Sequence, residues 1–234
     1  MKVVIYNDTV VPGRVHFGCD LVMKTFAEQL KRVDIELIGA IPIHIQEPRG
    51  NPLLERADLV IVNGEGSFHS NRRNDIAEVS RYFPSILINT LFHNNDVDLS
   101  KFLLLRARES ISAKNMGCEI MPDIIFSSNF LHSIKLPEGR KKVGRIRHFS
   151  NITTLRPHKK VLEDIVQCSE ISSESFHGIA VAHILGIPVT EILDGSGVPW
   201  KTHALQRDIV STENYVSKAK KQIDTFFESL HAIN

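Results

Sequence analysis

Short runs of apolar residues alternate with amphipathic stretches along much of the chain. Buried strands are predicted at residues 3 to 6, 35 to 41, 59 to 62, 85 to 89 and 103 to 105. Helices are predicted over residues 21 to 30, 76 to 82 and 110 to 116, the last ending at Gly117. Strands that alternate with helices favour an α/β fold with parallel strands and crossover helices.

The alternation is interrupted once, between residues 126 and 142, where the sequence shows no clear periodicity. This segment is the best candidate for a linker. Strands are predicted again at residues 143 to 149 and after Pro188, and helices at 158 to 168, 176 to 185 and 213 to 230. We therefore predict two α/β halves, residues 1–126 and residues 127–234, the second ending in the C-terminal helix.

Composition narrows the class of protein. The 28 basic and 27 acidic residues leave a formal net charge of +1, which gives no bulk attraction to nucleic acid or anionic membranes. Three widely separated cysteines argue against a disulfide framework and a CxxC-type zinc site, and the eleven histidines show no recurring metal spacing. This spacing leads us to expect a protein that holds no metal. Because we find no secretory leader and no apolar run of about 20 residues, we expect the protein to be cytoplasmic.

The apolar strand at residues 59 to 62 runs directly into Gly64, Glu65, Gly66 and Ser67. Glycines here allow a sharp turn and a close approach to a ligand, and a following helix would point its free N–H groups at an anion. Glu65 would stand at the carboxyl edge of the sheet, where crevice residues gather. The alternative is a strand-to-helix turn that uses glycine only for its geometry.

A second candidate site is the segment Ser172 to Gly178, in which hydroxyls and an acid precede a helix that carries His177 in its first turn. The imidazole could face an anionic ligand held at the same helix N-terminus. A lone histidine at a helix start can also be a structural hydrogen-bond partner.

Basic residues supply two weaker candidates. Arg108 follows a predicted strand and could clamp a phosphate or carboxylate, or it could pair with Glu109 at the surface. The run from Gly139 to His148 is typical of a solvated face, and because few aromatic residues interrupt it, nucleic-acid binding is only weakly supported.

Four segments, taken in order, resemble the polysaccharide pyruvyl transferase family. They are His16-Phe17-Gly18-Cys19-Asp20; Asp58 to Ser67; Arg108-Glu109-Ser110-Ile111-Ser112 with Gly117 and Pro122-Asp123-Ile124-Ile125-Phe126; and Ser173 to Val189, with Ser175-Phe176-His177-Gly178 and Gly186-Ile187-Pro188. Each motif is loose by itself, but their shared order covers nearly the whole chain.

The resemblance implies a GT-B-like fold, with two Rossmann-like halves facing each other across a cleft and a reduced second half of about four strands. It also implies transfer of a pyruvyl group from phosphoenolpyruvate to sugar hydroxyls, forming a ketal without a metal or cofactor. Arg108 and His177 would bind the donor or supply a proton, and Asp20, Glu65 and Glu174 would serve the acceptor or act as a base. The remaining donor-binding candidates are Gly64, Gly66, Ser67, Ser173, Ser175 and Gly178.

Two departures from the family keep other functions open. Ser175 stands where many members carry an arginine, and the chain is short. One alternative is a GT-B-like glycosyltransferase that uses a nucleotide sugar, with a glycan or a hydroxylated nucleic-acid base as acceptor. The other is a catalytically silent protein that binds sugars or supports assembly.

Overall fold

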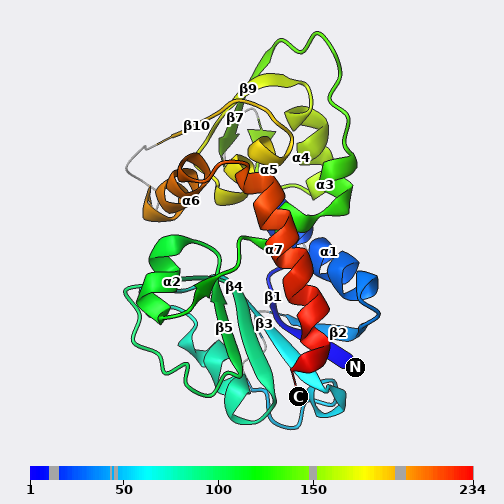
Figure 1. Cartoon of the computed structure of the whole chain (residues 1–234), viewed down its shortest axis with the longest axis vertical. Helices are drawn as coiled ribbons and strands as arrows, with labels where there is room; N and C mark the ends of the chain where they lie inside the picture. The colour runs from blue at the N-terminus through cyan, green and yellow to red at the C-terminus, as the bar shows by residue number, and fades with distance from the viewer. Residues whose placement is uncertain (11–15, 43, 45–46, 148–151, 193–198, 234) are drawn as a thin grey trace.

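The structure is a computed structural model that describes the chain except for residues 11–15, 43, 45–46, 148–151, 193–198 and 234. It is a mixed α/β fold with two parallel sheets, one in the lower and one in the upper part of Figure 1. The predicted alternation of strands and helices in an α/β fold is therefore confirmed. Among the described residues, no helix combines the length and the apolar character needed to cross a bilayer.

The first sheet has six parallel strands. They are β1 (Lys2–Asp8), β2 (Glu36–Pro42), β3 (Leu59–His69), β4 (Ser85–His93), β5 (Leu104–Ala107) and β6 (Glu119–Ile120). Their order across the sheet is β2-β1-β3-β4-β5-β6. The order reverses at β1, because β2 lies on one side of it and all later strands lie on the other.

Helical segments cover both faces of this sheet. Helix α1 (Phe17–Arg32) and the 3-10 segment η3 (Ile124–Ser127) pack on one face, and the 3-10 segments η1 (Leu54–Arg56) and η2 (Asn74–Arg81) pack on the other. Side chains of β1 alternate between the two cores, as strand geometry requires. Helix α2 (Ser110–Met116) ends at Gly117, whose φ of 63° confirms the predicted cap.

In the described part of the chain the second sheet has four parallel strands, the number expected for this half. They are β7 (Lys142–Arg147), β8 (Ile152–Thr153), β9 (Cys168–Ser173) and β10 (Val189–Glu191), in the order β10-β9-β7-β8. Residues 148 and 149 of the predicted strand lie outside the described part of the chain. Helices α4 (His158–Ile165) and α5 (Phe176–Ile184) pack on the face that carries Ile146.

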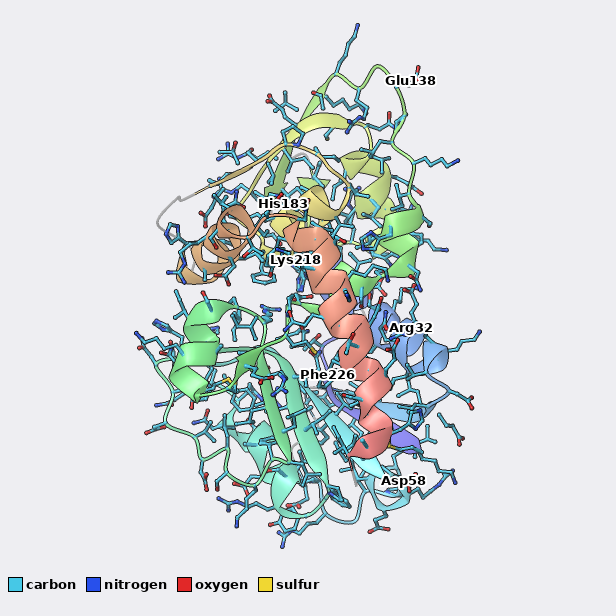
Figure 2. The ribbon with its side chains drawn as sticks, in the orientation of Figure 1. Arg32, Asp58, Glu138, His183, Lys218 and Phe226 are labelled. Carbon is cyan, nitrogen blue, oxygen red and sulfur yellow. The ribbon has the colours of Figure 1, made fainter. Side chains whose placement is uncertain are left out.

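The last long helix, α7 (Tyr215–Ser229), follows the second sheet in sequence but packs on the first half beside α1 (Figure 1). Phe227 meets Phe26 of α1 edge-on, with ring centroids 6.4 Å apart. Arg32, which lies beside this helix in Figure 2, donates to the Glu228 carboxylate at 2.7 Å and to the Asp224 carbonyl at 2.7 Å. The predicted second half therefore contributes its C-terminal helix to the core of the first.

Several elements differ from the sequence predictions, among them the short strands β6 and β8 and the strand β9, which were not predicted. Residues 76 to 81 of the predicted helix belong to the 3-10 segment η2, because Ile76 and Val79 are three residues apart and a helix with three residues per turn points both at the core. The predicted linker contains a short helix, α3 (Asn129–Ser133), which begins at the capping hydroxyl of Ser128. Helix α6 (Pro199–Ser211) was not predicted at all.

Candidate functional site

The carboxyl ends of β1 and β3 lie side by side at the point where the strand order reverses. Ligands of open parallel sheets bind at such switch points, because the loops that leave the two strands diverge there. Asn7 of β1 and Glu65 of β3 are both buried at this position. The φ of Glu65 is 36°, an uncommon value for a glutamate and one that clusters at functional sites, whereas asparagine adopts the φ of 69° found at Asn7 more readily.

The expected helix after the glycine-rich segment is not present. Strand β3 continues to His69, and the next helical segment begins only at Asn74. No helix N-terminus therefore follows Gly66, and the predicted anion cradle is wrong in this respect. The valine-rich and isoleucine-rich start of the strand was identified correctly, but pairing of Glu65 with Thr90 of β4 extends the strand through the glycines.

Gly64 is required for packing. A Cβ at this position would lie 2.1 Å from Oγ1 of Thr90, whereas a Cβ on Gly66 would meet nothing within 4 Å. Ser67 is buried and accepts a hydrogen bond from Asn7 Nδ2 at 3.0 Å. Gly64, Gly66 and Ser67 therefore shape the edge of the sheet. Glu65 is the residue of this segment whose carboxylate could act as an acid or a base.

Three buried asparagines connect the ends of the central strands. Asn7 Nδ2 donates to the Asn63 carbonyl at 2.6 Å, and Asn89 Nδ2 donates to Asn63 Oδ1 at 3.0 Å. Asn89 Oδ1 in turn accepts from the backbone N–H of Ile124 at 3.4 Å. This row ties β1, β3 and β4 to the start of η3, next to Asp123.

Asp123 joins two of the predicted site residues. Its carboxylate is fully buried; Oδ2 accepts from Arg108 Nη1 at 2.8 Å and lies 3.3 Å from His177 Nε2. The distance between His177 Nε2 and the carboxylate is that of an ion pair, although the angles at these atoms do not satisfy a hydrogen bond. Burial opposes the charged form, but His177 and Arg108 outweigh it and hold the pKa of Asp123 below its usual value.

Arg108 is held from a second side. The centre of its guanidinium lies 4.0 Å from the centroid of the Phe176 ring, a cation–π contact with the first residue of α5. The arginine is 3% exposed, so the surface pairing with Glu109 considered from the sequence is wrong. Glu109 instead caps α2 by accepting from the N–H groups of Ile111 and Ser112.

The residues before α5 are engaged in its cap. Ser175 Oγ accepts from the Gly178 N–H at 3.3 Å, and Ser173 Oγ accepts from the Ser175 N–H at 3.0 Å. A Cβ on Gly178 would lie 2.5 Å from Ser173 Oγ. Glu174 accepts from Arg147 Nε at 2.9 Å. These contacts fix the first turn of the helix and hence the position of His177.

The first turn of α1 brings the N-terminal motif to the same place. A Cβ on Gly18 would lie 2.0 Å from His177 Nδ1, so the imidazole packs against the helix backbone where only glycine fits. The adjacent residue, Cys19, lies near Glu65, and burial together with that carboxylate raises the pKa of the thiol. One turn of α1 is thus adjacent both to His177 and to Glu65.

Asp20, the third predicted catalytic residue, is engaged elsewhere. Its Oδ2 accepts from the His158 backbone N–H at 3.2 Å and lies 2.6 Å from His158 Nδ1. Although burial acts in the opposite direction, these contacts hold the pKa of Asp20 below its usual value. Asp20 therefore links α1 to α4.

Buried polar atoms without a hydrogen-bond partner concentrate around this centre. Most buried polar groups in proteins are paired, and each exception calls for an explanation such as a catalytic role or a bound ligand. Arg108 Nε, His177 Nε2 and Glu65 Oε1 all lack a hydrogen-bond partner, as do atoms of four neighbouring residues. The four are Asn7 Oδ1, Thr9 Oγ1, Asn63 Nδ2 and Thr90 Oγ1.

Sequence reasoning did not select Asp123 as a site residue, although it lies in the Asp-x-x-Phe segment used for the family resemblance. Its buried position between Arg108 and His177 depends on contacts between residues far apart in sequence. Within the described ranges, no group of three His, Cys, Asp or Glu side chains is arranged to hold a metal ion.

Comparisons with known proteins bear on the fold alone. No family model matches the chain, and no curated protein matches its sequence. A crystal structure of an uncharacterized protein from Klebsiella pneumoniae subsp. pneumoniae is similar, with a TM-score of 0.61 and 13% sequence identity over 88% of each chain. At this level of identity the similarity supports a Rossmann-like α/β fold and carries no information about activity.

Proposed function

We propose that the protein is a group transferase that moves a pyruvyl group from phosphoenolpyruvate to hydroxyls of a glycan or sugar-bearing precursor. The observation that carries this proposal is the contact of Arg108 and His177 with one buried carboxylate, Asp123, beside the turn of α1 that also lies near Glu65. Arg108, His177 and Glu65 each have a buried polar atom without a hydrogen-bond partner. On this proposal the two halves work as in GT-B enzymes, with reactants held between the strand ends of the first half and α5 of the second.

The roles of the three residues follow from their chemistry. Arg108 Nε would donate to the phosphate or carboxylate of phosphoenolpyruvate, since a guanidinium suits planar and tetrahedral oxyanions. His177 would give a proton to the methylene carbon of the donor. Glu65 would accept the proton of an attacking sugar hydroxyl. Asp123 would not touch the substrate but would hold Arg108 and His177 in place.

The proposed reaction balances without an external oxidant or reductant. One acceptor hydroxyl adds to C2 of phosphoenolpyruvate as the methylene carbon becomes a methyl group. A second hydroxyl then adds to C2 as the C–O bond to phosphate breaks, which completes the ketal and releases phosphate. Of the two protons lost by the hydroxyls, one resides on the methyl group and the other leaves with phosphate.

Measurements of donor binding and of turnover test the proposal. We expect calorimetry to detect phosphoenolpyruvate binding, and Arg108→Lys to weaken it about tenfold, because lysine keeps the charge but loses the forked N–H groups. His177→Gln should lower turnover by about 10²- to 10⁴-fold. His183→Gln, a change on the same helix, is the matched control because His183 pairs with Gln206. Binding of nucleotide sugars in place of phosphoenolpyruvate would make the donor assignment wrong.

A further inference from the structure

A groove of about 490 Å³ lies between α1, α3 and the start of α4, which Figure 1 shows along one side of the molecule. Its volume is within the range of ligand-binding pockets, about 300 to 1,000 Å³. Arg108, His177 and Glu65 are not among its lining residues, so the groove is distinct from the proposed active centre. It therefore needs an explanation of its own.

The lining of the groove is largely apolar. Leu21, Ala27 and Phe130 contribute to it. The imidazole of His158 also lines it and meets the Phe130 ring edge-on, with ring centroids 5.6 Å apart. Asp20 fixes this imidazole, because its carboxylate lies 2.6 Å from His158 Nδ1. Phe130 is 37% exposed, whereas most large apolar side chains of the described chain are buried. A partner that covers Phe130 would remove apolar surface from water.

The rim of the groove is positively charged. Lys24, Lys31 and Lys159 line it, and all three are exposed. None of them forms an ion pair with another residue of the part of the chain that the structure describes. The lining acid, Glu28, is already engaged, since it accepts from the Asn129 backbone N–H at 3.1 Å at the start of α3. Charge complementarity therefore favours an acidic partner.

The position of the lysines indicates the shape of that partner. Lys24 and Lys31 are seven residues apart, which is two turns of α1 and about 10 Å along its axis. A small anion would neutralise part of this charge but would leave Phe130 uncovered. A membrane surface binds side chains that project into it, whereas these residues surround a depression. An elongated partner with apolar side chains between its acids covers both the lining and the rim.

We propose that the groove docks an acidic amphipathic helix of a partner protein. Its lining comes from helices and from Ser128 at the start of α3, so it offers no strand edge to an extended peptide. Helices that bind in grooves insert apolar side chains at positions i, i+3, i+4 and i+7. Acids seven residues apart on such a helix would match Lys24 and Lys31. The stripe from Leu21 to Lys31 is about 15 Å long, the length of a helix of about 10 residues.

Selection of a phage library on the full-length protein tests the inference. The library displays random peptides of about 16 residues, long enough for four helical turns. We expect the enriched peptides to combine glutamate or aspartate with large apolar residues at helical spacing. Fluorescence anisotropy then measures the affinity of a synthetic enriched peptide, which should fall as the salt concentration rises. Neither a donor nor an acceptor is present, so the result does not depend on the proposed function.

The apolar part of the site is tested with Phe130→Ala. We expect this variant to bind the peptide about tenfold more weakly or worse, because truncation of an aromatic side chain at the centre of an interface has a large effect. Leu103→Ala is the matched control, since Leu103 is also an exposed large apolar residue but does not line the groove. It should bind the peptide like the wild type.

The charged part of the site is tested with the double variant Lys31→Glu, Lys159→Glu. We expect about tenfold weaker binding at low salt and a smaller difference at high salt, because the reversed charges repel the acids of the peptide. The double variant Lys101→Glu, Lys114→Glu makes the same change in net charge at two exposed positions outside the groove. This control should keep the wild-type affinity.

Thermal melting of each variant separates a loss of binding from a loss of folding, and we expect all of them to melt near the wild type because the substituted residues are exposed. The inference is overturned if no peptide is enriched. It is also overturned if the enriched peptides bind Phe130→Ala and the Lys31→Glu, Lys159→Glu variant as tightly as the wild type. Cosedimentation with phosphatidylserine vesicles that depends on Phe130, without any enriched peptide, would assign the groove to a membrane surface instead.

Discussion

At the scale of single residues, the centre of the molecule is a carboxylate placed between two potential cations. Asp123 is fully buried, and it is stable as an anion only because Arg108 and His177 lie beside it. The sequence indicated Arg108 and His177 as site residues but not Asp123, because nothing in the residues around this aspartate shows that it will be buried. The chemistry of the centre therefore depends on three residues that fold together and cannot be changed independently.

We expect Asp123→Asn to lower the free energy of unfolding by about 3 to 5 kcal/mol, because it leaves a buried guanidinium without its counterion. Urea denaturation measures this change. Asp96→Asn, at an exposed position, should lie within about 0.5 kcal/mol of the wild type. Equal stability of the two variants would mean that the charges of the cluster do not stabilise the fold.

The two glycines of the Gly64-to-Ser67 segment should respond differently to alanine. A methyl group at Gly64 collides with Thr90, whereas one at Gly66 has open space around it. We expect Gly64→Ala to destabilise the protein by about 1 to 3 kcal/mol, the usual cost of overpacking, and Gly66→Ala to have little effect. Thermal melting of the pair makes the comparison, and a greater loss in Gly66→Ala would contradict it.

At the scale of elements, periodicity identified the first five strands of the first sheet but missed β6, β8 and β9, and it described the irregular segments poorly. The strands of the first sheet are nearly continuous apolar runs, and such runs are typical of parallel strands buried on both faces. β3 is longer than its apolar run because Glu65 and Phe68 pair with β4, a contact that no local pattern encodes. Helix α6 was missed because the residues that it buries, such as Ala204 and Leu205, are few and gain their role from packing.

The C-terminal helix should be needed for the stability of the first half. Phe227 is fully buried against α1, so Phe227→Ala should cost about 3 to 5 kcal/mol through lost burial and a cavity. Chemical denaturation followed by a probe in the first sheet measures the loss. Lys221→Ala, at an exposed position on the same helix, is the control and should unfold like the wild type. A first half that kept its stability in Phe227→Ala would show that α7 is dispensable to it.

At the scale of the whole molecule, the two halves share one continuous apolar core. The core cluster that contains β1 and α1 also contains Ile146 of the second sheet, Ile179 of α5 and Phe227 of α7. The sequence predicted two halves from the interruption after residue 126, but the amphipathic pattern of α7 does not reveal which sheet its apolar face will meet. Similarly, the motifs predicted that their residues share one site. Which residues contact one another there depends on how the two halves pack, and the motifs do not encode this.

Two carboxylates that link the halves should make the whole fold sensitive to acid. Asp123 contacts His177 of α5, and Asp20 contacts His158 of α4; both have pKa values below the ordinary 3.8. A carboxyl group whose pKa is lower in the folded state stabilises the fold above its unfolded pKa, and this contribution is lost as the pH falls through the folded pKa. We expect the melting temperature to fall below about pH 4 for this reason.

Asp20→Asn tests the acid response without altering the proposed reacting groups. The variant should melt below the wild type at neutral pH, and the difference should shrink as the pH is lowered, because the wild type then loses the same contact. Melting curves recorded across the acid range give the comparison. A constant difference at all pH values would show that ionisation of Asp20 contributes nothing to the link between α1 and α4.

The position of α7 also sets the order in which the protein can mature on the ribosome. The six strands of the first sheet leave the exit tunnel early, but the apolar face beside α1 stays uncovered until α7 emerges about 100 residues later. At the usual pace of translation this delay is roughly 5 to 20 seconds. During that interval the nascent chain exposes an apolar surface. We therefore expect chaperones that bind apolar segments to cover this surface until synthesis of α7 is finished.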